Sequence, residues 1–179
     1  MKKKLLLGSL ALVLSTSLLA ESHWYIGAEY GSGSGDRAYD SSLTVGFNSS
    51  AATVKVGHMN ESYDKVELQY TAKTLENENN AADSDDVAEY KINFVTSIMK
   101  LSYEEMVIPY FEVALGYGDS TNFGGQFATH LGLGVMVNPI EAVEVSVGYR
   151  LSTSIGSTDN SVSYADQHGD LIVGAAYKF

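Results

Sequence analysis

Residues 168–179 alternate between two kinds of side chain. Counting back from the C-terminus, every second residue is apolar or aromatic, and the residues between them are mostly small or charged. A period of two is typical of a β-strand whose two faces differ. The apolar face carries no charge and consists of Phe179, Tyr177, Ala175, Val173 and Leu171. Because unpaired backbone groups in hydrocarbon cost several kcal/mol each, such a strand in lipid must belong to a closed barrel, and we expect it to pair with the first strand.

Seven earlier segments show the same alternation and predict seven further strands. They span residues 23–32, 52–60, 65–75, 89–100, 107–118, 126–137 and 142–152. The fold class we expect is therefore all-β, an eight-stranded antiparallel up-and-down transmembrane β-barrel.

The predicted connections alternate in length. Glycines break the first strand at 31–35 and open a long loop, and residues 76–88 and 153–167 are polar enough to form two more. Tight links are expected at 61–64, 102–106 and 138–141, and a moderate loop at 119–125. Long loops on one side and tight turns on the other are typical of outer-membrane barrels. Residues 43–47 also alternate, and because a ninth strand would invert this pattern we assign them to a hairpin or strand extension above the membrane.

The N-terminus predicts export. Three lysines precede an apolar run that begins at Leu5 and ends near Ala20, which indicates a signal peptide over residues 1–20 and a barrel domain over 21–179. The alternative, a membrane anchor helix, needs roughly 20 apolar residues, and this run is shorter. The bacterial outer membrane is the expected location.

The net charge and the composition limit which partners and which stabilising bonds the chain can have. Removing Lys2, Lys3 and Lys4 leaves eight basic residues against 22 acidic ones, a formal charge of −14. Nucleic acid is therefore excluded as a partner, because phosphate binding needs clustered Lys and Arg. With no cysteine in the chain, stability must come from the sheet and not from disulfides.

The faces opposite the apolar ones carry most of the charge. An eight-stranded barrel is only about wide enough inside for its own side chains. We therefore favour an ion-paired lumen, with Glu112 and Arg150 as the leading pair, over the alternative of a narrow conducting path. The predicted lumen residues are Glu29, Lys55, Glu67, Gln69, Lys73, Lys91, Asn93, Glu112, His130, Glu144, Arg150 and Asp170.

Aromatic residues collect at the predicted strand ends, as the interfacial girdles of a barrel do. Threading the strands up and down gives two groups. Trp24, Tyr177 and Phe179 fall at the inner rim, and Tyr30, Tyr90, Tyr117, Phe127 and Tyr149 at the outer rim.

Two stretches could carry other chemistry. The acidic stretch 83–86 offers oxygen ligands for a divalent ion, but it lacks the spacing of a calcium loop, and a solvated loop is favoured. His168 lies near Ser163, Asp166 and Asp170, a set that a lipid-modifying enzyme could use, and His130 is the other candidate imidazole. Nothing in the spacing orients a base toward a nucleophile. We expect no catalytic site, no metal site and no cofactor.

Four short segments resemble pieces of a known family, the small outer-membrane β-barrels of the OmpA-like and opacity type, also called the porin family. They lie at 113–118, 131–134, 147–150 and 173–179. The resemblance implies an eight-stranded barrel whose terminal aromatics, Phe179 and Tyr177, are read by the barrel-assembly machinery. It implies no single activity. As an outer-membrane barrel the chain would contact outer-membrane lipid, and its acidic loop would lie beside the divalent ions that bridge lipopolysaccharide.

The function we expect is that of a non-enzymatic outer-membrane barrel. It would contribute to envelope integrity and present surface loops to a host or environmental ligand. The alternatives are a narrow small-solute porin and, less favoured, an outer-membrane lipid-modifying enzyme.

Overall fold

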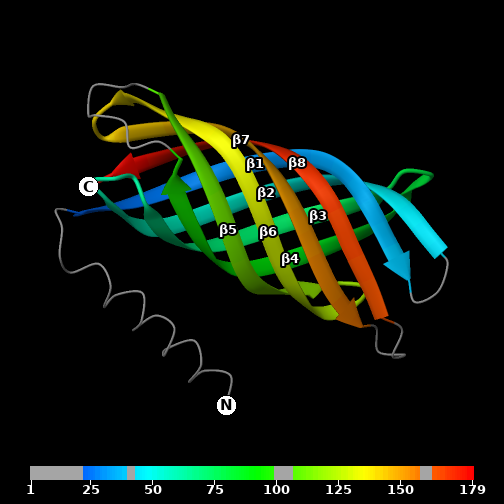
Figure 1. Cartoon of the computed structure of the whole chain (residues 1–179). Coiled ribbons are helices and arrows are strands. Elements are labelled where there is room, and N and C mark those ends of the chain that lie inside the picture. Colours follow the sequence, from blue (N-terminus) through cyan, green and yellow to red (C-terminus); the bar gives the residue numbers. More distant parts are fainter. Residues whose placement is uncertain (1–21, 40–42, 99–106, 158–162) are drawn as a thin grey trace, which may run out of the picture.

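Eight antiparallel strands form one closed barrel (Figure 1). The computed structural model describes residues 22–39, 43–98, 107–157 and 163–179, with the backbone alone at 81–83. The expected signal peptide therefore lies outside the described residues. The strands are β1 (Ser22–Tyr39), β2 (Leu43–Asn60), β3 (Lys65–Asn77), β4 (Asn80–Ser97), β5 (Val107–Ser120), β6 (Gly124–Ile140), β7 (Val143–Ser157) and β8 (Ser163–Lys178).

The first and last strands close the barrel, as the alternation at the C-terminus predicted. They pair from Tyr25 with Lys178 to Tyr39 with Tyr164. Following the paired residues once around the barrel from Glu29 leads back to β1 at Tyr39, ten residues further along. Such a stagger is what tilted strands need in order to close. We call the end at which β1 begins and β8 ends the terminal end, and the opposite end the distal end (Figure 1).

The strands are longer than the sequence predicted, and the predicted alternation of loop length is wrong. All eight strands have 13–18 residues, whereas about 9–11 tilted residues cross a bilayer. The segments expected to be long loops at 76–88 and 153–167 are largely strand, and the β3–β4 connection is a turn at residues 78–79. The acidic stretch 83–86 therefore belongs to β4. Polar composition indicated a loop here, but the hydrogen-bonded ladder to β3 continues to Asn80.

The prediction that the glycines at 31–35 break the first strand is also wrong. β1 continues past it in register with β2 and β8. A Cβ added at Gly33 would collide with the backbone carbonyl of Gly169, and one at Gly35 with that of Gln167. These glycines therefore allow the two closing strands to approach each other closely.

Residues 43–47 extend β2, as expected, and do not form a ninth strand. Phe47 pairs with Gly35, and Leu43 with Tyr39. The turn predicted at 138–141 lies later, at residues 141–142, because β6 continues to Ile140 with an irregular register that accommodates Pro139. The predicted link at 102–106 and the end of the predicted strand 89–100 fall on residues that the structure does not describe.

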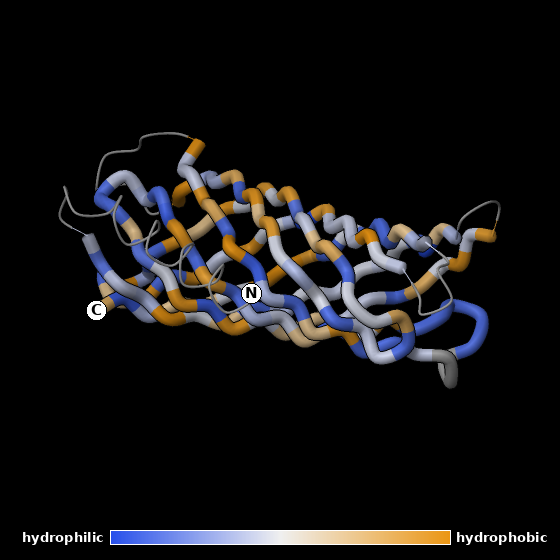
Figure 2. The backbone as a smooth tube through the Cα atoms, turned by 90° about the horizontal axis from the view of Figure 1, so that it is seen from below, coloured by the Kyte–Doolittle hydropathy of each residue, from blue (hydrophilic) through white to orange (hydrophobic). Residues whose placement is uncertain are grey.

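The two faces of the sheet divide polar from apolar residues. Figure 2 shows hydrophilic and hydrophobic residues alternating along the strands. Leu133 is 58% exposed on the outer wall, whereas Glu67 is 1% exposed inside the barrel. In the described part of the chain, no helix is long and apolar enough to cross a membrane.

Candidate functional site: an ion-paired lumen

The interior of the barrel is the candidate site, because it gathers the ionisable side chains. Alternation along each strand places them on the inner face. All twelve predicted lumen residues are buried there: Glu29, Lys55, Glu67, Gln69, Lys73, Lys91, Asn93, Glu112, His130, Glu144, Arg150 and Asp170.

Arg150 lies at the centre of the largest network. Its Nε is 2.8 Å from Glu112 Oε1, and its second guanidinium nitrogen is 3.0 Å from Glu29 Oε2. Lys55 Nζ lies 2.5 Å from the other oxygen of Glu29 and 3.4 Å from Glu67 Oε1. The two cations thus hold three carboxylates from β1, β3 and β5, which compensates for much of the cost of burying the charges.

Asn93 joins this network to His130. Its side-chain nitrogen donates to Glu67 at 2.8 Å and to Glu112 at 3.0 Å. Its side-chain oxygen is therefore left to accept, and His130 Nε2 lies 3.3 Å from it. The network assigns the proton of a neutral His130 to Nε2.

Two smaller groups lie further toward the distal end. Glu89 accepts from Lys73 at 2.8 Å and from Lys91 at 2.7 Å, so that one carboxylate serves two ammonium groups. Asp170 accepts from Ser49, and His168 Nε2 lies 3.3 Å from it. The alignment there is not that of a hydrogen bond, because neither ring nitrogen of His168 has a hydrogen-bond partner among the described residues.

The terminal end is closed by apolar side chains and one turn residue. Tyr63, in the turn between β2 and β3, packs against two buried clusters, which contain Tyr25 and Met59 in one case and Tyr110 and Met136 in the other. Its backbone has a φ of 61°, an uncommon value for a bulky residue. Asn60 supports this conformation, because its side-chain oxygen accepts from two backbone N–H groups of the turn. Lys65 and Glu144 form an ion pair among the buried residues of this end.

The distal end is closed by Arg37, which lies beyond the length of strand that a bilayer needs. Its guanidinium binds Asp166 at 2.6 and 2.8 Å and Asp85 at 3.0 Å. Burial alone would lower the pKa of Arg37, but hydrogen bonds and charge from Asp166 and then Asp85 raise it above its ordinary value. Phe123 covers the guanidinium at 4.1 Å from its ring centroid, and Tyr164 lies at 5.0 Å.

The candidate catalytic and metal groups are not brought together. Ser163 is exposed, whereas His168 is buried in the lumen, five residues further along the same strand. Asp85 points inward to Arg37, and the adjacent Asp86 is exposed on the outer wall. Neighbouring strand residues face opposite sides, so neither set can converge on one substrate or ion. Within the described ranges, no group of three or more His, Cys, Asp and Glu residues could hold a metal.

The predicted girdle residues are all exposed on the outer wall. At the terminal end, the backbone N–H of Phe179 donates to the carbonyl of Trp24 at 2.9 Å. Tyr117 is paired in register with both Tyr90 and Phe127. The exposed set comprises Trp24, Tyr30, Tyr90, Tyr117, Phe127, Tyr149, Tyr177 and Phe179.

Several lumen residues were missed from the sequence, because three of them fell in predicted loops and the fourth, Glu89, is the first residue of a predicted strand. These are Arg37, Asp85, Glu89 and Asp166. A signal was present at Arg37, since glycine and serine alternate from 31 to 35 and place residue 37 on the inner face. Because glycine-rich stretches usually indicate turns or loops, this alternation was not recognised as a strand.

Comparisons with known proteins support the fold. No protein-family model matches the chain, and a search of curated proteins finds no match either. Among solved structures, neisserial surface protein A (NspA) is 13% identical, with 87% of this chain and 97% of that chain covered and a TM-score of 0.63. A de novo designed transmembrane β-barrel is 14% identical, covering 88% of this chain and 95% of that chain, with a TM-score of 0.45. OmpT of Vibrio cholerae is 13% identical, covering 89% and 57%, with a TM-score of 0.34. Of these three structures, NspA is the one whose TM-score exceeds 0.5, and this similarity supports the barrel fold but no particular function.

Proposed function

We propose that this chain is a bacterial outer-membrane β-barrel with a plugged lumen, which stabilises the envelope and presents a rim of hairpins at the cell surface. On this proposal the distal end faces outward, and the rim consists of hairpin turns such as those at residues 78–79 and 121–123. The long loops expected from the sequence are therefore not part of the proposal.

The membrane location is proposed because polar side chains lie inside the barrel and apolar ones outside, the reverse of the arrangement in a soluble protein. Ionisable side chains such as Lys55 are buried in the lumen, whereas Leu133 and Leu171 on the outer wall are 58% and 60% exposed. Monomeric soluble proteins rarely expose contiguous apolar patches larger than a few hundred Å². An apolar outer wall of this kind is stable in the hydrocarbon core of a bilayer. Because the sheet is closed, it exposes no unpaired strand edge to the hydrocarbon.

The paired charges carry the proposal of a plugged lumen. A conducting path needs water between the side chains, but here each central cation binds carboxylates directly, at 2.5–3.4 Å for Lys55 and 2.8–3.0 Å for Arg150. Tyr63 and Arg37 close the two ends of the barrel, which further obstructs the passage of ions through the lumen. A narrow pore is the competing function.

The proposal includes no enzyme activity, because Ser163 and His168 lie on opposite faces of β8. It also includes the relationship to the OmpA-like and opacity-type barrels that the sequence resembles. An export signal at residues 1–20, lipopolysaccharide as a neighbour and recognition of Phe179 and Tyr177 by the assembly machinery belong to the same proposal. That NspA is named a surface protein is consistent with it.

Three measurements test the proposal. Refolded protein should need detergent or lipid to remain in solution, and it should migrate differently on a gel before and after boiling. In planar bilayers it should give no reproducible open steps. Solubility without detergent would disprove the membrane location, whereas regular conductance steps would disprove the plugged lumen and favour the pore.

A further inference from the structure

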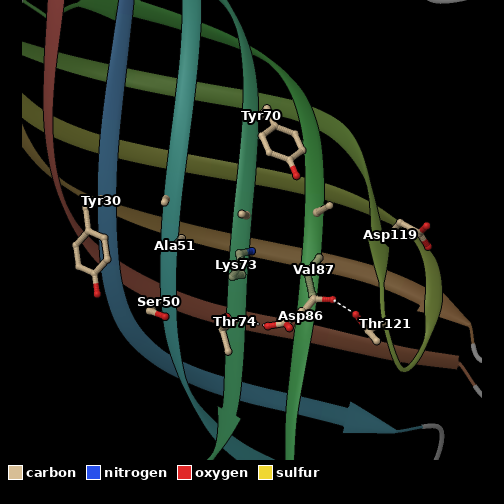
Figure 3. Close-up of a pocket in the computed structure, with 13 residues that line it drawn as sticks. Tyr30, Ser50, Ala51, Tyr70, Lys73, Thr74, Asp86, Val87, Asp119 and Thr121 are labelled. Atoms are coloured by element: carbon tan, nitrogen blue, oxygen red, sulfur yellow. Dashed lines mark hydrogen bonds between the residues drawn. The ribbon is translucent and has the colours of Figure 1, made fainter.

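The outer wall carries a shallow trough on the face formed by β1 to β5. Figure 3 shows the residues that line it. Its volume is about 500 Å³, within the roughly 300–1,000 Å³ typical of small-molecule sites. Its floor is a row of three alanines, Ala52, Ala72 and Ala88, that are direct neighbours on adjacent strands. Tyr30 ends the row on β1 and Asp119 ends it on β5.

The two long edges of the trough differ in chemistry. Toward the terminal end, the edge is aromatic, because Tyr70 lines the trough there. Behind it, Tyr90 is paired with Tyr70 in register, and their ring centroids are 5.1 Å apart. Toward the distal end, the edge consists of Ser50, Thr74 and Asp86, which are also in register. The trough therefore lies where the apolar wall gives way to hydrogen-bonding groups.

Hydroxyl and carboxylate groups are available along the distal edge. Thr74 Oγ1 donates to Asp86 Oδ1 at 2.8 Å, which fixes the orientation of the carboxylate. Thr121 joins the edge, because its backbone N–H and its hydroxyl both bind the Asp86 carbonyl, at 2.9 and 3.0 Å. A ligand with several hydroxyl groups could donate to the carboxylate and exchange hydrogen bonds with Ser50.

The charge of the trough argues against a phosphate ligand. Its exposed charged groups are Asp86 and Asp119. The backbone of Lys73 lines the trough, but its ammonium group points into the lumen, where it is bound to Glu89 at 2.8 Å. A phosphate would therefore meet like charge with no cation beside it, whereas an uncharged sugar has no such penalty.

We propose that this trough binds the sugar headgroup of a glycolipid, whose acyl chains lie along the apolar wall toward the terminal end. A pyranose ring has an apolar C–H face, which suits the tyrosines and the alanine floor, and a rim of hydroxyls, which suits the Ser50–Thr74–Asp86 edge. The continuity of the trough with the apolar wall selects a ligand that carries a lipid chain. This inference rests on the proposed membrane location and adds a ligand class and a site to it.

The test uses full barrel labelled with ¹³C at alanine methyl groups and folded in dodecylphosphocholine micelles. n-Dodecyl-β-maltoside supplies a sugar on a single chain, and dodecyldimethylamine oxide supplies the same chain without a sugar. We expect saturable shifts of the Ala52, Ala72 and Ala88 methyl signals with the maltoside only. The methyl of Ala175, which is exposed on β8, should not give a saturable shift.

Ala72→Leu fills the trough without touching the lumen and should weaken the apparent maltoside affinity at least tenfold. Asp86→Asn and Thr74→Val should weaken it severalfold, and the matched control Ala175→Leu should leave it unchanged. Equal shifts with both detergents, non-saturable shifts that include Ala175, or a dimer that buries the trough would each overturn the inference. If the barrel needs detergent but gives one of these results, the inference fails while the membrane location stands.

Discussion

Arg150 on β7 reaches past β6 to Glu112 on β5, with 2.8 Å between Nε and Oε1. The same guanidinium also holds Glu29 on β1, so one side chain links three strands across the lumen. The two ends of the pair are not equivalent, because Arg150 has a second carboxylate to bind, Glu29. Among the described residues, the other groups near the Glu112 carboxylate are the amide of Asn93, at 3.0 Å, and the imidazole of His130, at 3.9 Å.

Arg150→Met should destabilise the barrel by about 3–5 kcal/mol, because it leaves buried carboxylates uncompensated. Glu112→Gln should cost less, about 1–3 kcal/mol, because Arg150 keeps Glu29. Urea unfolding in lipid vesicles measures both, and the outward-facing Leu151→Met is the control, at under about 1.5 kcal/mol. Equal effects of the two lumen substitutions would contradict the network described here.

A charge on the outer wall should be costly in proportion to its depth. Leu133→Lys places an ammonium group on the apolar wall and should reduce the free energy of unfolding by about 2–4 kcal/mol. Ser34→Lys, exposed near the distal end of β1, should cost about 0–1 kcal/mol. The same vesicle experiment compares them, and indistinguishable values would place the bilayer elsewhere on the barrel.

The glycines of β1 give a matched pair. Gly33→Ala should destabilise the barrel by about 1–3 kcal/mol, because the added methyl meets the Gly169 carbonyl. At Gly31 the nearest atom to an added Cβ is 3.6 Å away, an ordinary contact. Gly31→Ala should therefore change the stability by no more than about 0.5 kcal/mol. The free energies of unfolding of the two variants test the close approach of β1 and β8, which would be refuted if both alanines were tolerated.

Removing the distal closure should loosen one end of the barrel only. Arg37→Met breaks hydrogen bonds to Asp85 and Asp166, each worth about 1.5–3 kcal/mol. Hydrogen exchange of the distal residues of β1, β4 and β8 should then accelerate by on the order of tenfold or more, with the central strand segments unchanged.

Asp36→Asn is the control for this experiment, because Asp36 is adjacent to Arg37 but exposed on the other face. Uniform acceleration along the strands would mean that Arg37 supports the whole barrel, contrary to the local role assigned to it. Acceleration in the control as well would show that any change at this end has the same effect.

Some features could be read from the sequence because they depend on local alternation. The period of two at Leu171, Val173 and Ala175 fixed which face of β8 meets solvent, and the same reasoning placed Glu112 and Arg150 inside. Strand length could not be read in this way. Polar residues at 76–88 and glycines at 31–35 suit loops by composition, but the barrel continues there because each segment stays paired with a neighbouring strand. Residues 31–35 pair with both β2 and β8, whereas the distal part of β4 pairs with β3, and β4 pairs with β5 only from Val87 onward.

The sequence by itself determined the number of strands, the faces of the side chains within the predicted strands and the closure of β8 on β1, because a two-residue period and an open edge are properties of single strands. Only the tertiary structure decided that Arg37 meets Asp85 and Asp166, and that three alanines on separate strands line one trough. Those contacts depend on the ten-residue stagger of the closed barrel. That stagger is set by how all eight strands pack around one interior, and no single segment carries it.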